Sequence, residues 1–580
     1  MKRFFVPLIA ALLVLALAAP SALAQAPTPK VTITGLFDQI TSMGRNFYDG
    51  NASRDNDREW YARTRFRPDF VFEVGRVKAV LGLEIDLQYG QSGPNDGGFP
   101  GNNSGVAGGA VTGNGTTTTG CKNNSNGCLD LNTDVGGMIE IKWVYTEFPL
   151  TGKDSVMPFI PVETMARAGG QPFGSLANTR AIYANGDFAG LSGVTTFAPN
   201  LKTNLAFVVV EDQLAGGNRA PATTRTSRGE DYASILSPEI SPFKGLDIKP
   251  LFSWFHADGL TSSSSRHAVT NRRFVGTAGA TCSTAANCSN TNSPAALGGG
   301  APAGDSTNQE DRYTVGLDLR WRSGPFGFDP IVHYQWGHAD HQAVRTNGTV
   351  GRVEGDLSSY IVDLIGSFQT GPFLLEARGV YSPGNKARDN LAQTIRYYQP
   401  LTTDGNYWSR WAAILASGDV DYFNGALLTN QARFIGYDRY GIAALGLRAT
   451  YNITPAFNVY SWITQMWTAE KVDTDTGAAP GLGGGSVSRT TVSDRSWVEG
   501  DSRNVGTEVD LGFVWRFAPN VLLEVQGAYL FAGHALDTAE CVVTGTPAPT
   551  NCGAGATAGV HTRREATDAY TLGTKLRFAF

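Results

Sequence analysis

Long apolar runs are missing from the chain once its first 24 residues are passed. Runs such as "LAFVVV" (205–210) and "WAAILA" (411–416) are far shorter than the 18 or more residues that a membrane-spanning helix needs. Charge is also sparse, because charged residues make up 17% of the chain, against roughly 25% in an ordinary soluble domain. A formal net charge of -5 argues against a nucleic-acid partner. These absences exclude a bundle of membrane helices and disfavour a nucleic-acid-binding protein.

Cysteine is scarce, and its positions suggest structural use. The six cysteines fall in three close pairs within stretches rich in Gly, Asn, Thr and Ala, namely Cys121 and Cys128, Cys282 and Cys288, and Cys541 and Cys552. The simplest interpretation is three local disulfides that pin three loops in an oxidising compartment. Six cysteines allow 15 pairings, so this prediction depends on proximity alone. A metal site is the rival, but the sequence contains no C-x-x-C motif.

Catalytic signatures are missing as well. The sequence has neither a G-x-S-x-G nucleophile elbow nor a P-loop, two motifs that position reactive groups in common enzyme folds. We therefore predict no enzyme activity and no cofactor. His256, His338, His341 and His534 recur where predicted strands run into loops. We interpret them as polar residues that face water, with a metal site at the rim as the less favoured alternative.

The amino terminus has the features of an export signal. It begins with Lys2 and Arg3, continues with an apolar run and ends in "ALA" (22–24) before Gln25. This arrangement is typical of a secretory signal peptide with an A-x-A cleavage site. We predict a signal peptide over residues 1–24 and a single domain over residues 25–580.

What the sequence does contain is strict alternation of polar and apolar residues. In "YARTRFRPDFVFEVG" (61–75), Arg63, Arg65 and Arg67 stand two apart, with apolar residues between and after them. The pattern recurs in 77–90, 311–322, 507–518 and 569–580. Alternation of this kind indicates half-buried β-strands. Pro68 lacks an N–H donor, so we expect a bulge or a weakened pairing there.

The length of the alternating runs favours a membrane. Many exceed the five or six residues that are usual in soluble sheets, and they suit tilted strands that cross a bilayer. Tyr, Trp and Phe stand at several run ends, as in the aromatic girdles of membrane barrels. A soluble sandwich or propeller is the less favoured alternative, and no repeat of propeller period is found.

Short and long connections alternate along the chain. The short ones are predicted at 75–76, 151–154, 198–200, 323–327, 370–372, 454–455 and 518–520. The long ones are predicted at roughly 42–58, 91–135, 169–185, 214–228, 258–309, 341–355, 383–437, 469–504 and 534–566. Counting the runs predicts about 18 strands, with both termini on the side of the short turns.

A sheet in lipid cannot leave edge N–H and C=O groups unpaired, so it must close into a barrel. The last strand, starting near Thr567, is expected to pair with the first, at 31–40. The predicted fold class is therefore all-β, a transmembrane antiparallel up-and-down barrel. A barrel this wide is not filled by its own side chains, so it holds water unless loops plug it.

The chain ends in "YTLGTKLRFAF", with apolar residues alternating up to Phe580. Together with the export signal and the alternating turns and loops, this resembles Gram-negative outer-membrane porins. The resemblance implies a place in the cell outer membrane, surrounded by lipid, and recognition of the Phe580 strand by the barrel-assembly machinery. By analogy with many porins it also implies a homotrimer.

The resemblance implies a passive channel for small hydrophilic solutes or ions. One alternative is a dedicated channel that exports or imports a specific substrate such as an acidic polysaccharide. Another is a scaffold barrel that sheathes a periplasmic partner.

If the apolar faces contact lipid, the opposite faces line the pore. The residues expected there are Arg63, Arg65, Arg67, Asp69, Glu73, Lys78, Glu84, Asp86, Arg320, Arg322, Glu376, Arg378, Arg448, Arg516 and Arg577; Glu508 and Asp510 belong to the same inward set. Such charges either tune which solutes enter or pair across strands and brace the wall. For the row formed by Arg63, Arg65 and Arg67, the two interpretations are equally supported.

Two long loops are candidates for narrowing the pore. The loop at 169–186 carries Arg180 and Tyr183. The loop at 383–437 is rich in aromatic residues, including Tyr407, Trp408 and Trp411, and is therefore expected to be ordered. It either packs into the lumen as a constriction, or caps the mouth or contacts a neighbouring subunit.

Overall fold

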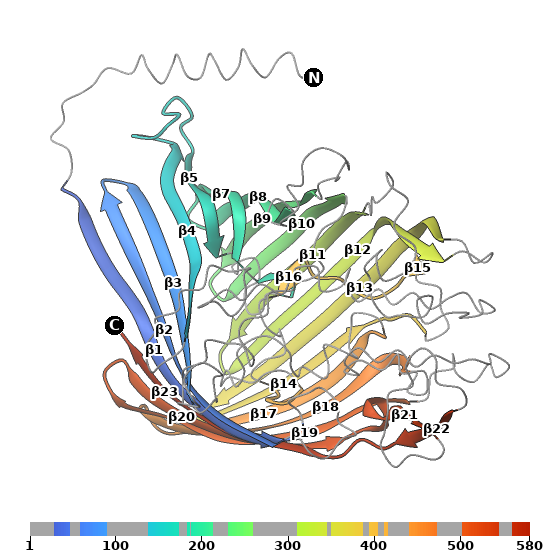
Figure 1. The fold of residues 1–580 in the computed structure, drawn as a ribbon. Helices are drawn as coiled ribbons and strands as arrows, with labels where there is room; N and C mark the ends of the chain where they lie inside the picture. The colour runs from blue at the N-terminus through green and yellow to red at the C-terminus, as the bar shows by residue number, and fades with distance from the viewer. Residues whose placement is uncertain are drawn as a thin grey trace, which may run out of the picture.

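Eighteen long strands form one closed antiparallel barrel in a computed structural model of the chain (Figure 1). The residues that the structure describes are 28–46, 58–89, 137–172, 182–185, 187–212, 230–258, 310–344, 350–386, 394–403, 411–415, 440–472, 502–543 and 559–580. The predicted fold class and the predicted number of strands are both confirmed.

Each barrel strand pairs with its neighbours along the chain. The strands are β1 (Lys30–Arg45), β2 (Arg58–Val74), β3 (Val77–Tyr89), β4 (Gly137–Thr151), β5 (Glu163–Pro172), β7 (Asp187–Ala198), β8 (Leu201–Asp212), β9 (Glu230–Phe243), β10 (Leu246–Asp258), β11 (Glu310–Ser323), β12 (Phe326–Val344), β13 (Val350–Thr370), β14 (Phe373–Ser382), β17 (Ile442–Thr454), β18 (Phe457–Val472), β19 (Ser502–Ala518), β20 (Val521–Ala532) and β23 (Ala569–Ala579).

Smaller elements accompany the barrel. They are β6 (Ala184–Asn185), β15 (Thr394–Ile395), β16 (Thr402–Thr403), the 3-10 helix η5 (His534–Leu536), β21 (Thr538–Val543) and β22 (Gly559–Arg564). In the part of the chain that the structure describes, no helix is long and apolar enough to cross a membrane.

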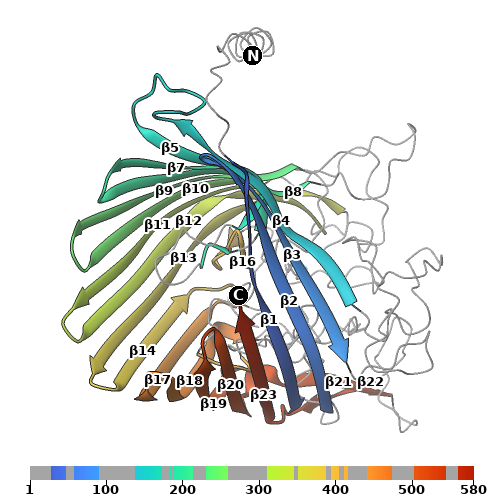
Figure 2. The same cartoon turned by 90° about the vertical axis from the view of Figure 1, so that its left-hand side faces the viewer.

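The barrel closes between its first and last strands. β1 pairs with β23 from Leu36 opposite Ala579 to Arg45 opposite Tyr570. The Gly35 N–H donates to the Phe580 carbonyl at 2.9 Å, and the Phe580 N–H donates to the Gly35 carbonyl at 3.0 Å. Both views place β1 beside β23 (Figures 1 and 2). The predicted pairing of the terminal strands is confirmed.

The two faces of the wall are inside out relative to a soluble protein. On β19, Glu508 and Asp510 have exposures of 0%, whereas their neighbours Val509 and Leu511 are 39% and 67% exposed. The period of two along a strand puts these pairs on opposite faces. On this strand, charged groups therefore lie on the inner face and apolar groups on the outer face, as expected for a barrel in lipid.

Exposed aromatic residues form two bands on the outer face. Several strands carry one near each end, with a spacing of eight positions between Tyr313 and Trp321, Phe328 and Trp336, Phe373 and Tyr381, and Tyr570 and Phe578. Eight residues of strand span about 26 Å along its length. This spacing is of the same order as the apolar band of an outer-membrane barrel, which is flanked by aromatic girdles.

The turns follow the predicted pattern with three differences. A turn at residues 244–245 was missed; its Gly245 adopts a φ of +94°, but "KG" lacks the usual turn dipeptides. The turn predicted at 151–154 covers residues 152–162 instead. Residues 341–344 and 350–355, which were predicted to lie in a long loop, belong to β12 and β13, because these strands extend further than their alternation indicated.

Pro68 interrupts the wall on one side, as predicted. It pairs with Gly35 of β1, but the ladder between β2 and β3 skips from Phe66 to Asp69. Because the register is the same on both sides of this gap, the pairing is weakened without a bulge.

Candidate pore and its constriction

β2 carries its three arginines on the inner face of the barrel. Arg65 Nη2 lies 3.0 Å from Glu84 Oε1, and Arg67 Nε lies 3.2 Å from Glu84 Oε2. Lys142 Nζ of β4 lies 3.6 Å from the same carboxylate. Arg63 is fully buried, with an exposure of 0%. Glu84 therefore offsets the repulsion within the row, although three cations share this one carboxylate.

Further acids and an indole extend this cluster. Lys142 also lies 2.9 Å from Asp187 of β7. The Trp143 indole N–H donates to Asp69 at 3.0 Å, and the Arg67 guanidinium stands 5.6 Å from the Trp143 ring centroid. Asp86 is the β3 residue opposite Arg65, and its side chain lies outside the described residues.

Alternating charges continue toward the short turns. Glu73 lies 3.7 Å from Lys30 and 3.5 Å from Lys78. Glu147 lies 3.9 Å from Lys78 and accepts a hydrogen bond of 2.7 Å from Arg167. At this end of the wall, partly exposed ion pairs follow one another, and each of these charged side chains lies beside one of opposite charge.

The wall from β13 to β18 holds the most buried ion pair. Arg378 donates to both carboxylate oxygens of Asp363, at 3.0 and 2.7 Å, and both side chains have exposures of 0%. Arg448 Nε lies 3.7 Å from Glu376, and its guanidinium stands 5.1 Å from the Trp462 ring centroid. Paired and bidentate geometry is what a buried charge requires.

The remaining predicted wall residues lie near the short-turn ends. Arg322 binds both carboxylate oxygens of Asp329, with a distance of 2.8 Å between Nη2 and Oδ2. Arg320 and Arg516 have exposed side chains, and Arg320 stands opposite Asp247 in the ladder.

Ion pairs also bridge the closing strands. Arg577 of β23 donates to both oxygens of Asp38 of β1. Lys575 Nζ lies 2.9 Å from Glu524 of β20, which also accepts a hydrogen bond of 3.2 Å from the Tyr460 hydroxyl. Ion pairs on the inner face therefore join neighbouring strands at the closure and beside it.

Residues 182–185, from the loop between β5 and β7, are packed against the wall. Tyr183 is 2% exposed, and its hydroxyl lies 2.6 Å from the Ser253 hydroxyl of β10. Burial raises the pKa of the Tyr183 phenol above its ordinary value of 10.0, so the phenol is neutral at physiological pH. The Leu401 N–H donates to the Tyr183 carbonyl at 2.7 Å, and β6 pairs with β16. The described parts of the two long loops are thus joined.

Residues 394–403 are joined to β11 and β12 by amide and guanidinium groups. Gln335 and Gln399 exchange two hydrogen bonds, from the Gln335 side chain to the Gln399 carbonyl at 2.7 Å and from the Gln399 N–H to the Gln335 side chain at 2.8 Å. Arg312 donates to the Gln399 side chain at 2.7 Å. The Tyr398 hydroxyl lies 2.9 Å from His333 Nδ1. All five side chains are buried.

Residues 411–415 belong to the same long loop and contact another sector of the wall. All five are buried, including Trp411 at 4%. Their backbone N–H groups point at Glu508 and Asp510 of β19. Because these segments come from loops yet bind inward-facing wall residues, they occupy the lumen. They fill part of a barrel that is too wide to be filled by the side chains of its own wall.

Several predicted positions lie outside the described residues. They are Arg180, Tyr407, Trp408 and the cysteines Cys121, Cys128, Cys282, Cys288 and Cys552. Cys541 lies in β21 opposite His561 of β22, and its side chain is not among those described.

The contacts that hold the loops inward were not predicted from the sequence. Alternation places Gln335 and Glu508 on inner faces, but it does not say which loop meets them. Gln399 lies in an irregular segment without any period. The one available signal was the unusual aromatic content of the loop that contains Tyr398 and Trp411.

The histidines at the rim contact carboxylates. His256 Nδ1 lies 2.9 Å from Asp311 Oδ1, and His338 Nε2 lies 3.9 Å from Asp311 Oδ2. His534 Nδ1 lies 3.1 Å from Asp537. Within the described ranges, no group of three or more His, Cys, Asp or Glu side chains could hold a metal ion. The His341 side chain is not among those described.

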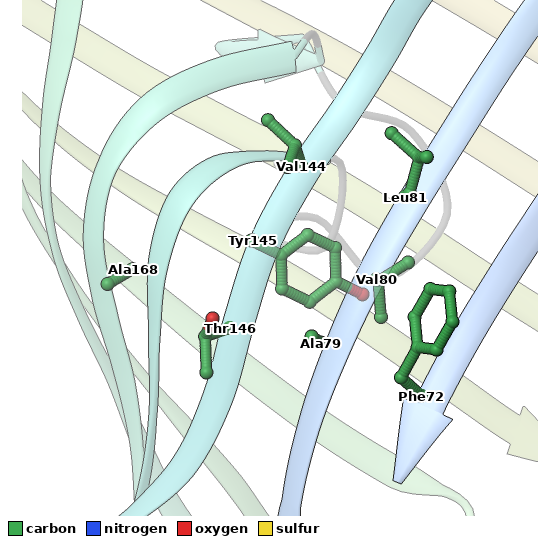
Figure 3. A pocket seen from close by; sticks show the side chains of 8 residues that line it. All are labelled: Phe72, Ala79, Val80, Leu81, Val144, Tyr145, Thr146 and Ala168. Carbon is green, nitrogen blue, oxygen red and sulfur yellow. The ribbon is translucent and has the colours of Figure 1, made fainter. Parts of the chain in front are cut away.

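A cavity of about 320 Å³ is lined by the eight side chains labelled in Figure 3. Its lining comes from β2, β3, β4 and β5 and contains Phe72, Ala79, Val80, Leu81, Val144, Tyr145, Thr146 and Ala168. Phe72 and Val144 are 46% and 55% exposed, so the cavity opens on the outer, apolar face. It is therefore separate from the candidate pore.

Comparison with known proteins finds matches among solved structures alone. No protein-family model and no curated protein matches the chain. Among solved structures, it resembles OccK8 (OprE) of Pseudomonas aeruginosa at 8% identity and a TM-score of 0.43, covering 95% of this chain and 98% of that one. It resembles OccAB2 of Acinetobacter baumannii at 10% identity and a TM-score of 0.42, covering 95% of this chain and 98% of that one. It resembles OprD of P. aeruginosa at 9% identity and a TM-score of 0.41, covering 96% of this chain and 98% of that one. Similarity this low carries no argument about the site, which depends on the geometry above.

Proposed function

We propose that the protein is a passive outer-membrane channel through which small hydrophilic solutes or ions diffuse down their gradients. The observation that carries the proposal is the inverted barrel: an apolar outer face, a charged inner face and loop segments held inside. An apolar exterior suits lipid, and a charged interior suits a water-filled path. The loop segments narrow that path.

The charged inner-face residues are proposed to line the pore, with Tyr183 and Trp411 in the constricting segments. Most of these charges are paired with the opposite sign, which supports bracing of the wall as their first role. Around Glu84, however, three cations, Arg65, Arg67 and Lys142, lie within 4 Å of one carboxylate. This concentration of cations supports a modest preference for anions.

A dedicated channel for an acidic polymer is the second candidate. The cluster of Arg65, Arg67 and Lys142 around one carboxylate favours it. The paired charges on the rest of the described wall count against a continuous basic track. The buried loop segments likewise count against a barrel that sheathes a folded periplasmic partner, because they occupy the space such a partner would need.

The remaining parts of the proposal follow from the sequence. Residues 1–24 are proposed as the export signal, and the strand ending in Phe580 as the part recognised by the barrel-assembly machinery. A homotrimer is proposed by analogy with porins, and no enzyme activity is proposed. The outer membrane is the location that fits all of these features.

Planar-bilayer recording tests the proposal. Purified, folded protein is expected to give stepwise conductance, and reversal potentials in asymmetric KCl are expected to show a modest anion preference. Folding is checked by heat-modifiable migration in gel electrophoresis. Folded protein that gives no conductance would refute the open channel.

A further inference from the structure

The segment 411–415 is anchored by an acid of the wall. Glu508 Oε1 accepts hydrogen bonds from the N–H groups of Ala413 and Ile414, at 2.5 and 2.7 Å. Glu508 Oε2 accepts one from the Leu415 N–H at 2.7 Å. Successive backbone N–H groups that converge in this way form a concavity that binds anions. Here the acceptor is a carboxyl group of the barrel itself.

Other groups support the same docking. Asp510 Oδ1 also accepts from the Ala413 N–H, at 3.2 Å, and is itself held by the Gln526 side chain at 3.1 Å. The Thr464 hydroxyl donates to the Trp411 carbonyl. The segment is therefore held from β18 and β19 at both of its ends.

The Trp411 ring extends the contact across the wall. The Arg378 guanidinium stands 5.9 Å from its centroid. A Cβ atom placed on Gly446 of β17 would lie 2.7 Å from Trp411 Cε3, so the ring packs directly over a position without a side chain. Wall residues from β14 to β19 thus form one binding site for a five-residue stretch of loop.

The contact lies at the level of one aromatic band. Glu508 precedes Val509, and Val509 stands opposite Tyr529, which pairs with Tyr570 of that band. Because β19 continues past Glu508 to Ser502, the segment lies inside the barrel, against its inner wall. A segment at this depth limits the width of the path for solutes.

We infer that Glu508 is the positioning residue that holds segment 411–415 in the lumen and thereby sets the size limit of the pore. The inference rests on the proposed channel function. Removing the carboxylate leaves three buried N–H groups without their acceptor, a state that is costly in a closed interior. The segment then leaves the wall and the path widens.

The test compares wild type with E508A and E508Q. E508A is expected to raise the single-channel conductance and to admit larger neutral sugars in liposome swelling. E508Q is expected to give a smaller increase, because its amide oxygen still accepts hydrogen bonds. The control is D568N, because Asp568 is an exposed acid that also accepts a hydrogen bond from a backbone N–H, that of Ala532 at 3.0 Å, and the segment 411–415 is not among its partners; its size limit is expected to match the wild type.

A second measurement does not depend on conductance. Ala413 is 2% exposed, so a cysteine introduced by A413C is expected to react slowly with a water-soluble thiol reagent. Adding E508A is expected to speed that reaction. Equal labelling rates and an unchanged size limit in folded E508A would overturn the role of Glu508. Silent wild-type protein would refute the open channel instead, and E508A that then conducts would support the role of Glu508.

Discussion

Arg577 of the last strand and Asp38 of the first form a bidentate ion pair where the barrel closes. The distances from Nε to Oδ1 and from Nη2 to Oδ2 are both 2.6 Å, and the two residues are direct partners in the ladder. The Asp38 side chain is 3% exposed and the Arg577 side chain is 36% exposed. Losing the arginine therefore leaves a buried carboxylate, whereas losing the aspartate leaves a guanidinium that reaches water.

This asymmetry predicts that R577Q destabilises the barrel more than D38N does. The expected cost of R577Q is about 2 kcal/mol, the scale of a buried polar group that loses its partner. Urea unfolding in lipid vesicles measures both variants. In the double variant the cost is expected to be less than the sum of the two; strictly additive costs would show that the pair does not interact.

A substitution at Leu511 tests whether water or lipid contacts the outer face. Leu511 is 67% exposed, so in water L511R would change stability by about 0.5 kcal/mol or less. In lipid the same change is expected to cost about 2 to 4 kcal/mol. The control is V156R, because Val156 is also 67% exposed but lies in the turn at 152–162, outside the strands. If L511R is as mild as the control when refolded into vesicles, the outer face does not contact hydrocarbon.

The arginine row predicts a change in ion selectivity. Replacing Arg65 and Arg67 together by glutamine removes two cations from the Glu84 cluster, so the reversal potential in asymmetric KCl is expected to shift toward cations. R76Q serves as the control, because Arg76 lies in the turn between β2 and β3. Unchanged anion permeability and conductance in the double variant would assign the row to bracing alone.

A substitution at Gly446 is expected to raise the conductance for a steric reason, as E508A is expected to do by removing a hydrogen-bond acceptor. In G446A the new methyl group meets the Trp411 ring, which is expected to displace segment 411–415 and raise the single-channel conductance. G366A is the matched control, since a Cβ atom there has nothing within 4 Å. A G446A channel with wild-type conductance would show that the ring adjusts without moving the segment.

The strands of this barrel could be predicted because their pattern is local. In β2 and β19, charged and apolar residues alternate with the period of the backbone, and lipid requires the apolar set to face outward. Strand number and closure followed from counting such runs. The missed turn at residues 244–245 shows the limit of this method, because it lies between two runs without a strong turn signature.

The partners of the inner charges and the path of the loops are decided only by the tertiary structure. Alternation predicts that Glu508 faces inward, but its hydrogen-bond partners lie 93 to 95 positions away. Arg577 likewise meets Asp38 across 539 positions. A loop has no period that specifies its contacts, so its place depends on where closure of the barrel brings unpaired N–H groups and a buried carboxylate together.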